Sequence, residues 1–213
     1  MKRIGAVALS ALLAGAVGLR AGQPEPFAVD SAASRVRVHL GRAGLLKFLG
    51  HDHEIDAPIA EGRVMVVEGD PARSSVRLRF DARRLSVVPG IEPGGDIPKV
   101  EARMRGPEVL DVERHPEIVF ASSSVAGEAI EPGRYRLRVR GTLELKGRLF
   151  PVEIPLEVRQ AGGEIQAGGE AEWRLRDLGI EPPSVAGVVN VANGFRMSFE
   201  IAARPRPPAA SGP

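Results

Sequence analysis

Apolar and polar residues alternate almost without interruption between Gly133 and Val158, where the sequence reads GRYRLRVRGTLELKGRLFPVEIPLEV. Alternation with a period of two places one set of side chains on a buried face and the other in solvent, so it predicts β-strands. The segment therefore predicts two half-buried strands joined by a tight turn at Lys146 and Gly147. The apolar face comprises Tyr135, Leu137, Val139, Leu143 and Leu145 in the first strand and Phe150, Val152, Ile154, Leu156 and Val158 in the second.

This two-residue turn also predicts how the two strands pair. Leu143 then faces Phe150, and the two apolar faces fall on the same side of the hairpin. Pro151 and Pro155 lie on the polar face of the second strand. Because proline cannot donate to a hydrogen-bonded ladder, we expect this pair of strands to be interrupted.

The same alternation recurs along the rest of the chain, bounded by Gly- and Pro-containing turns, and predicts an all-β domain. Val100 and Met104 lie four residues apart before Gly106 and Pro107, which predicts one short helix over residues 99–105. About eight strands in an antiparallel meander suit a closed barrel. Further strands are expected at 34–40, 51–59, 62–68, 74–81, 117–125, 170–176 and 195–201, with an irregular crossing at 41–50.

The first residues have the pattern of an export signal. A basic start, Met1–Arg3, precedes an Ala-, Leu-, Val- and Gly-rich run that ends at Leu19, as in secretory signal peptides. An uncleaved membrane anchor is the alternative, but a spanning helix needs about 20 mainly apolar residues. We therefore expect a signal peptide at residues 1–22, a barrel domain at 23–203, a disordered proline-rich tail at 204–213, and a periplasmic or secreted protein.

Composition excludes several kinds of site. The 213 residues include no cysteine, so disulfides, thiolate catalysis and cysteine-ligated zinc are excluded. The formal net charge of +2 is small, and the arginines alternate with apolar residues instead of forming a block, which argues against nucleic-acid binding. An arginine-rich outer face would suit transient contact with anionic lipid head groups, although solubility explains it equally well.

Several motifs, taken in order, resemble the YceI-like family, and the resemblance covers residues 27–202. It implies an eight-stranded, lipocalin-like antiparallel barrel with one or two short helices that holds a polyisoprenoid or similar amphiphile in an elongated apolar cavity. The helix sequence VEARMR departs from the family, so no ligand contact is transferred to it. The motifs are FAVD at 27–30 with SRV at 34–36, VRLRFD at 76–81, EVLDV at 108–112, HPEIVF at 115–120, GTLELKG at 141–147 leading to Pro151 and Val152, and LGI at 178–180.

A long apolar ligand requires a cavity lined by inward-facing aliphatic and aromatic side chains. The alternating pattern identifies which residues face inward, but the alternative that they fill a closed core stays open. The candidate lining residues are Val36, Val38, Leu78, Phe80, Phe120, Leu137, Val139, Phe150, Val152, Trp173, Leu175, Met197 and Phe199.

His51 and His53 are two residues apart, so on a strand both rings would project to one face. With Asp52, His39 or His115 they are a weak candidate for a zinc, nickel or copper site. Histidines at the barrel rim, without a metal, are the preferred interpretation. A hydrolase centred on this pair lacks a nucleophile motif, so no catalytic residue is assigned.

The sequence therefore predicts a non-catalytic lipid-binding or carrier protein without a resident cofactor, whose ligand is a polyisoprenoid or quinone-like lipid. Two alternatives stay open: a metal protein or hydrolase centred on His51 and His53, and a stress-related structural or interaction protein with a filled barrel. Transient membrane-surface contact and a homodimer also stay open.

Overall fold

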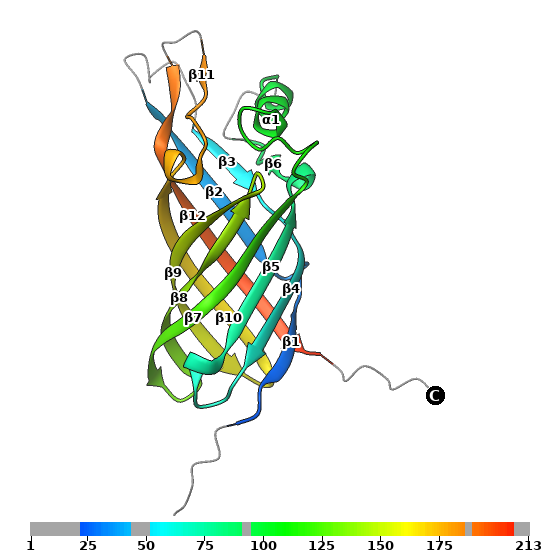
Figure 1. The fold of residues 1–213 in the computed structure, drawn as a ribbon. Helices are drawn as coiled ribbons and strands as arrows, with labels where there is room; N and C mark the ends of the chain where they lie inside the picture. Colours follow the sequence, from blue (N-terminus) through cyan, green and yellow to red (C-terminus); the bar gives the residue numbers. More distant parts are fainter. Residues whose placement is uncertain (1–21, 44–51, 91–94, 186–188, 207–213) are drawn as a thin grey trace, which may run out of the picture.

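The computed structural model describes residues 22–43, 52–90, 95–185 and 189–206 (Figure 1). The expected signal peptide and most of the expected tail lie outside these ranges, so both stay predictions. The strands are β1 (Glu25–Val29), β2 (Arg35–Ala43), β3 (His53–Asp56), β4 (Ile59–Val66), β5 (Ser75–Asp81), β6 (Ser86–Val87), β7 (Glu117–Glu131), β8 (Arg134–Leu145), β9 (Arg148–Ala161), β10 (Glu164–Arg174), β11 (Ser184–Val185) and β12 (Val189–Pro205). The helices are α1 (Ile97–Arg105) and the 3₁₀ turns η2 (Pro71–Arg73), η3 (Ala82–Arg84) and η4 (Arg176–Leu178).

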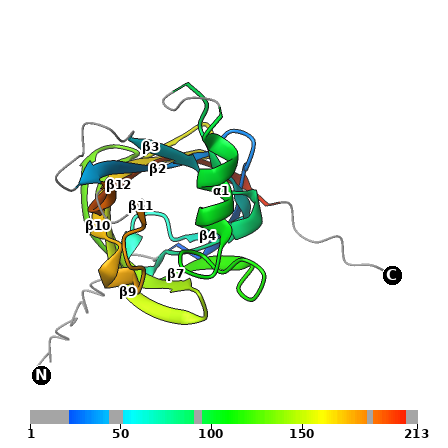
Figure 2. The ribbon, with the colours of Figure 1, turned by 90° about the horizontal axis from the view of Figure 1, so that it is seen from above.

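Eight of these strands close into an antiparallel barrel, in the order β1-β4-β5-β7-β8-β9-β10-β12, because β12 pairs with β1. The other part of β12 pairs with β2, β2 pairs with β3, and β3 pairs with β6. This arrangement confirms the predicted eight-stranded barrel, and Figure 2 shows the ring from above. Because β12 pairs with β1, it extends to Pro205. The first two residues of the expected disordered tail therefore belong to a strand.

The β8–β9 hairpin has the predicted register, with Leu143 opposite Phe150. The expected interruption at Pro151 and Pro155 is wrong, because both residues pair with β8 without a shift. On its other edge, β9 pairs with β10 only over residues 157–161. The two prolines lie outside that stretch. At their positions β9 has no second partner strand and therefore requires no N–H donor on that edge. Proline is therefore tolerated there without a break in the hairpin.

Other boundaries differ modestly from those expected. β2 extends to Ala43, so the predicted irregular crossing starts later than Gly41, and residues 44–51 lie outside the described ranges. The strand expected at 51–59 is two elements, because Ala57 and Pro58 separate β3 from β4. β7 continues to Glu131, beyond the predicted end at Val125.

Helix α1 lies at one end of the barrel, over one side of the ring (Figure 2). It begins two residues earlier than expected, with a proline in its first turn, a position where the missing N–H is harmless. Glu101 accepts a hydrogen bond from the Val87 N–H at 3.0 Å, and Arg105 donates one to the Leu85 carbonyl at 2.9 Å. These contacts fix α1 to β6 and the segment before it. Within the described ranges, no helix has the length and apolar character needed to cross a membrane.

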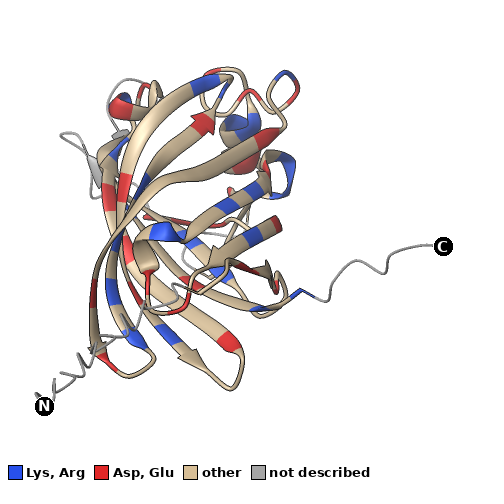
Figure 3. Cartoon of the chain, turned by 60° about the horizontal axis from the view of Figure 1, so that its bottom comes forward, with Lys and Arg blue, Asp and Glu red and all other residues tan. Residues whose placement is uncertain are grey.

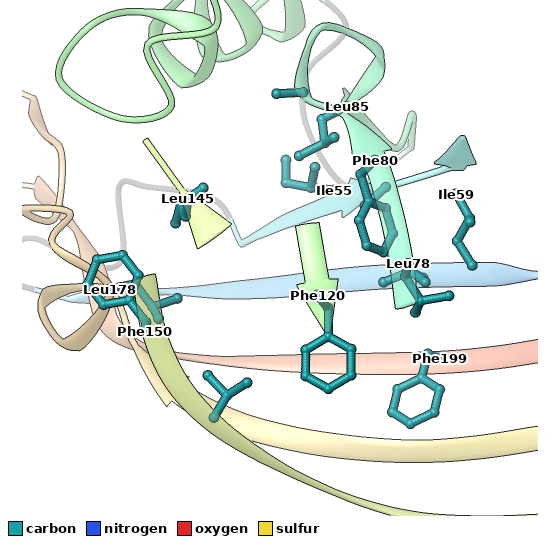
Figure 4. Packing of buried hydrophobic residues seen from close by; sticks show 14 of the residues in the cluster. Ile55, Ile59, Leu78, Phe80, Leu85, Phe120, Leu145, Phe150, Leu178 and Phe199 are labelled. Carbon is teal, nitrogen blue, oxygen red and sulfur yellow. The ribbon is translucent and has the colours of Figure 1, made fainter. Parts of the chain in front are cut away.

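The interior is packed most fully at the α1 end. Leu145, Phe150, Leu178 and Ile180 are all buried there and belong to the main hydrophobic cluster, which also includes residues lower in the barrel; Figure 4 shows part of this cluster. Gly179 lies between Leu178 and Ile180 with φ 69°, a backbone conformation that favours glycine. A Cβ at Gly179 would lie 3.3 Å from the Phe150 ring, so the segment after η4 packs against the start of β9. A smaller cluster of Phe27, Ile165 and Ala203 lies at the opposite end.

Charges of both signs are interspersed on the outer surface (Figure 3). On β8 and β9, Arg140 contacts Glu153 at 2.6 Å, Arg138 contacts the same carboxylate at 3.3 Å, and Arg136 contacts Glu157 at 3.3 Å. The hydrogen bond from Arg140 holds the pKa of Glu153 below its usual value. The face that looks basic from β8 alone is therefore a mixed-charge surface, and single pairs of this exposed kind contribute little to stability.

Candidate functional site

The barrel encloses an elongated cavity of about 190 Å³. Its wall is built from β2, β4, β5, β7, β8, β9, β10 and β12, so almost the whole ring contributes. Most of the lining is aliphatic or aromatic: Val36, Val64, Val66, Val67, Pro71, Val76, Leu78, Phe80, Phe120, Val125, Tyr135, Leu137, Val139, Leu143, Ile154, Leu156, Val158, Ile165, Ala167, Trp173, Met197, Phe199, Ile201 and Ala203.

Two aromatic rings lie against glycines of neighbouring strands. A Cβ atom at Gly141 would lie 2.7 Å from the Phe120 ring, and one at Gly169 would lie 2.9 Å from the Phe199 ring. Only glycine permits so close an approach, because any other residue would push the ring away. Both rings therefore lie close to the barrel wall, which leaves space in the lumen.

The polar lining residues are gathered at one end of the cavity, which we call the mouth. Glu68 and Ser74 belong to the connection between β4 and β5, Ser75 begins β5, Tyr135 lies near the start of β8 and Gln160 near the end of β9. Figure 1 shows these hairpin ends opposite α1. The cavity therefore has a polar mouth and an apolar interior.

Hydrogen-bonding groups at the mouth differ in their availability. The Ser74 hydroxyl accepts a hydrogen bond from the Val67 N–H at 3.0 Å. Among the residues that the structure describes, neither the Tyr135 hydroxyl nor the Gln160 side chain makes a hydrogen bond to protein. Both side chains are half-buried, so they can bind water or a ligand.

The candidate residues divide into those that line the cavity and those that do not. Phe150, Val152 and Leu175 are buried and Val38 is partly buried, but none of the four lines the cavity. The ligand-binding role of the whole set stays a prediction. The candidates that do line the cavity are Val36, Leu78, Phe80, Phe120, Leu137, Val139, Trp173, Met197 and Phe199.

Sequence reasoning missed part of the wall. Val64, Val66 and Val76 alternate in predicted strands and could have been found by the same parity argument. Ser74 and Gln160 carried no such signal, because polar residues at strand ends are usually turn residues in solvent. Only the three-dimensional arrangement shows that they border the cavity.

A second hollow, of about 800 Å³, lies beside β2, β3, β10 and β12, and its lining is partly charged. His53, at the start of β3, lines it together with His39 and Arg174, while His51 lies outside the described residues. Trp173 lines both hollows, and its ring packs edge to face on Phe195 with the centroids 6.0 Å apart. This aromatic pair marks the boundary between the apolar cavity and the polar hollow.

The proposed metal site is not assembled within the described part of the chain. No group of three or more His, Cys, Asp or Glu side chains there is placed to hold a metal ion. His115 lies elsewhere, beside Gly147 at the β8–β9 turn. The role of His51 stays untested.

His39 belongs to a polar cluster that joins β2, β3 and β12. Its ring lies 3.0 Å from the Ser198 hydroxyl and 3.7 Å from the Glu54 carboxylate. Arg37 makes the shorter contact with Glu54, at 2.6 Å, and also contacts Asp56 at 3.1 Å. Because the arginine holds this carboxylate, the cluster is best explained as a cross-strand charge network.

An antiparallel eight-stranded barrel around one elongated apolar cavity defines a lipocalin-like class of protein. Residues 27–203 match the YceI-like domain, and the chain belongs to the YceI-like family.

The fold is shared with solved structures. The BcnA protein of Burkholderia cenocepacia superposes with a TM-score of 0.57 at 18% identity, over 82% of this chain and 98% of BcnA. A YceI protein of Campylobacter jejuni gives a TM-score of 0.50 at 11% identity, over 72% of this chain and 82% of that protein. Identities this low show the fold alone. No curated protein sequence matched the chain.

Proposed function

We propose that the protein is an exported, non-catalytic carrier that holds a polyisoprenoid or similar amphiphile, such as a quinone-like lipid, in the barrel cavity. The observation that supports this proposal is the apolar lining of the cavity between its mouth and Trp173. Burial of each methylene group contributes about 0.8 kcal/mol. A long apolar chain can therefore bind tightly without any charged contact.

The size of the cavity limits the shape of the ligand. Its 190 Å³ is somewhat more than the roughly 150 Å³ of an apolar cavity that binds benzene. Pockets for drug-sized molecules usually measure about 300–1,000 Å³. A single narrow chain fits this space better than a bulky ring system, and a long chain requires lining side chains to move apart.

Extraction of bound lipid provides the test. The full chain, with its leader, would be produced in a bacterial host and purified without detergent, and an organic extract would be analysed by mass spectrometry. Two variants form a matched pair at adjacent residues of β10. Ala167 lines the cavity, whereas Gln166 is exposed on the outer face, so Ala167→Phe blocks the lumen and Gln166→Phe leaves it open.

We expect a reproducible isoprenoid or quinone-like lipid from the unmodified protein and from Gln166→Phe, and little from Ala167→Phe. Empty protein in every preparation, together with no uptake of added polyprenol, would refute the carrier proposal. Equal recovery from both variants would show that the lipid binds outside the barrel. Fractionation of the producing cells, with determination of the mature N-terminus, tests export separately.

A further inference from the structure

We propose that the mouth of the cavity binds an uncharged, hydrogen-bonding head group, such as an alcohol or amide, while the apolar tail points toward Trp173. This inference rests on the carrier function proposed above and specifies the class of its ligand. It follows from where the polar lining residues lie, which charges they carry and which of them lack protein partners.

The distribution of polarity sets the orientation of the ligand. Glu68, Ser75 and Gln160 lie at the mouth, whereas Phe120 and Trp173 belong to the apolar remainder of the lining. A polar head group moved into that interior would lose its hydration without gaining a hydrogen bond, which is strongly unfavourable. The tail must therefore enter first, and the head group stays at the mouth.

The charge at the mouth sets the class of head group. Glu68 is the charged residue of the described lining, which contains no Lys or Arg. Phosphate groups are normally held by Arg or Lys, and here a phosphate would lie near a carboxylate of the same sign. An anionic head group is therefore disfavoured at this end.

The free hydrogen-bonding groups match a neutral head group. Tyr135 offers a hydroxyl that both donates and accepts, and Gln160 offers an amide with both capacities. Neither side chain is bonded to another described residue. An alcohol or amide can pair with both of them while its chain occupies the apolar cavity.

The polar hollow near Arg174 and Arg196 offers a competing arrangement, in which the ligand is reversed. Its two arginines could pair with an anionic head group, but four carboxylates line the same hollow: Asp52, Glu54, Glu172 and Asp177. To reach it from the cavity, a chain must pass the boundary formed by the rings of Trp173 and Phe195. A head group at the mouth requires no passage between these rings, so the structure favours the orientation with the head group at the mouth.

The test uses three probes with one tail: farnesol, farnesyl phosphate and the hydrocarbon farnesene. Trp173 is the single tryptophan of the chain and lines the cavity, so its fluorescence reports binding in delipidated protein. We expect farnesol to bind at least about tenfold more tightly than farnesyl phosphate. Replacement of Glu68 by Gln should reduce the ratio of the two affinities about threefold. The effect is small because the repulsion between the Glu68 carboxylate and the phosphate acts through water.

Variants at the mouth separate head-group recognition from tail burial. Tyr135→Phe and Gln160→Met should each weaken farnesol binding about fivefold, the usual effect of one lost hydrogen bond, and leave farnesene binding unchanged. Gln166→Met, on the outer face of β10, is the control and should change neither the farnesol affinity nor the farnesene affinity. Long-chain alcohols brominated at the tail should quench Trp173 more strongly than alcohols brominated beside the hydroxyl.

The outcomes distinguish this inference from the function on which it rests. If none of the three probes binds, the carrier proposal itself fails. If all bind, but farnesyl phosphate binds as tightly as farnesol, the neutral head group is wrong and the carrier stands. Unchanged farnesol affinity in both mouth variants, or stronger quenching by bromine beside the hydroxyl, would overturn the proposed position of the head group.

Discussion

Substitution of Ala167 by leucine would show directly whether the barrel is hollow. Ala167 lies on β10, opposite Ile201 on one side and Val158 on the other, and lines the cavity. Leucine adds three carbon atoms at this position. In a hollow barrel they enter existing space, whereas in a filled barrel they displace their neighbours, so the two cases predict opposite signs for the change in stability.

The magnitude follows from the cavity itself. Burial of three further carbons contributes at most about 2.4 kcal/mol, at about 0.8 kcal/mol for each methylene group. A cavity of about 150 Å³ holds the six carbons of benzene, so 190 Å³ accommodates three without strain. For a domain of this size, a gain of about 2 kcal/mol raises Tm by about 4–8 °C. The same atoms forced into a packed core would cost about 1–3 kcal/mol.

The assay is thermal and urea unfolding of delipidated protein, because a bound lipid would stabilise the native state and obscure the comparison. Ala82→Leu is the control, since Ala82 is fully buried within the packed cluster and should lose stability. We expect Ala167→Leu to be stabilised and Ala82→Leu to be destabilised. Destabilisation of both variants by similar amounts would refute the hollow barrel.

Two further predictions concern the turns and the outer charges. Gly147 has φ 66°, and a Cβ there would lie 3.0 Å from His115. Gly147→Ala should therefore lower the free energy of unfolding by more than the roughly 1–2 kcal/mol of left-handed backbone strain. Gly162→Ala, with φ 61° and no close neighbour, measures that strain alone, and equal urea midpoints for the two variants would contradict a cost from the contact with His115. Arg140 lowers the pKa of Glu153 from 4.5. The stabilising effect of this ion pair is therefore present above pH 4.5 and is lost as pH falls through the lower folded-state pKa of Glu153. If the unfolding midpoint of a Glu153→Gln variant falls with acid as steeply as that of the unmodified protein, this prediction is wrong.

The local parts of the fold could be predicted, and the non-local parts could not. Register in the β8–β9 hairpin follows from a period of two and a two-residue turn, both contained in one short segment, and the structure has Leu143 opposite Phe150 as expected. The effect of Pro155 depends instead on whether β10 pairs with β9 at that height. Nothing near the proline in sequence carries that information.

The cavity illustrates the same limit more sharply. Phe120 and Phe150 both occupy inward-facing positions of alternating strands, and the sequence gives no reason to separate them. In the structure, Phe120 lies against Gly141 of the barrel wall and lines the cavity, whereas Phe150 lies against Gly179 of the segment after η4 and does not line it. Parity determines that a side chain faces inward, but the partner that it meets determines whether space remains beside it.

The inward row of β10 explains why this barrel has an internal cavity. Eight strands enclose an interior that side chains of ordinary size can just fill. Along β10 the inward positions between Ile165 and Trp173 carry Ala167, Gly169 and Ala171, so one strand contributes almost no volume over that stretch. The Phe199 ring lies against Gly169 and covers the gap without closing the lumen. The cavity therefore depends on small residues in one strand, and larger residues in that row should convert the protein into a filled barrel of the same topology.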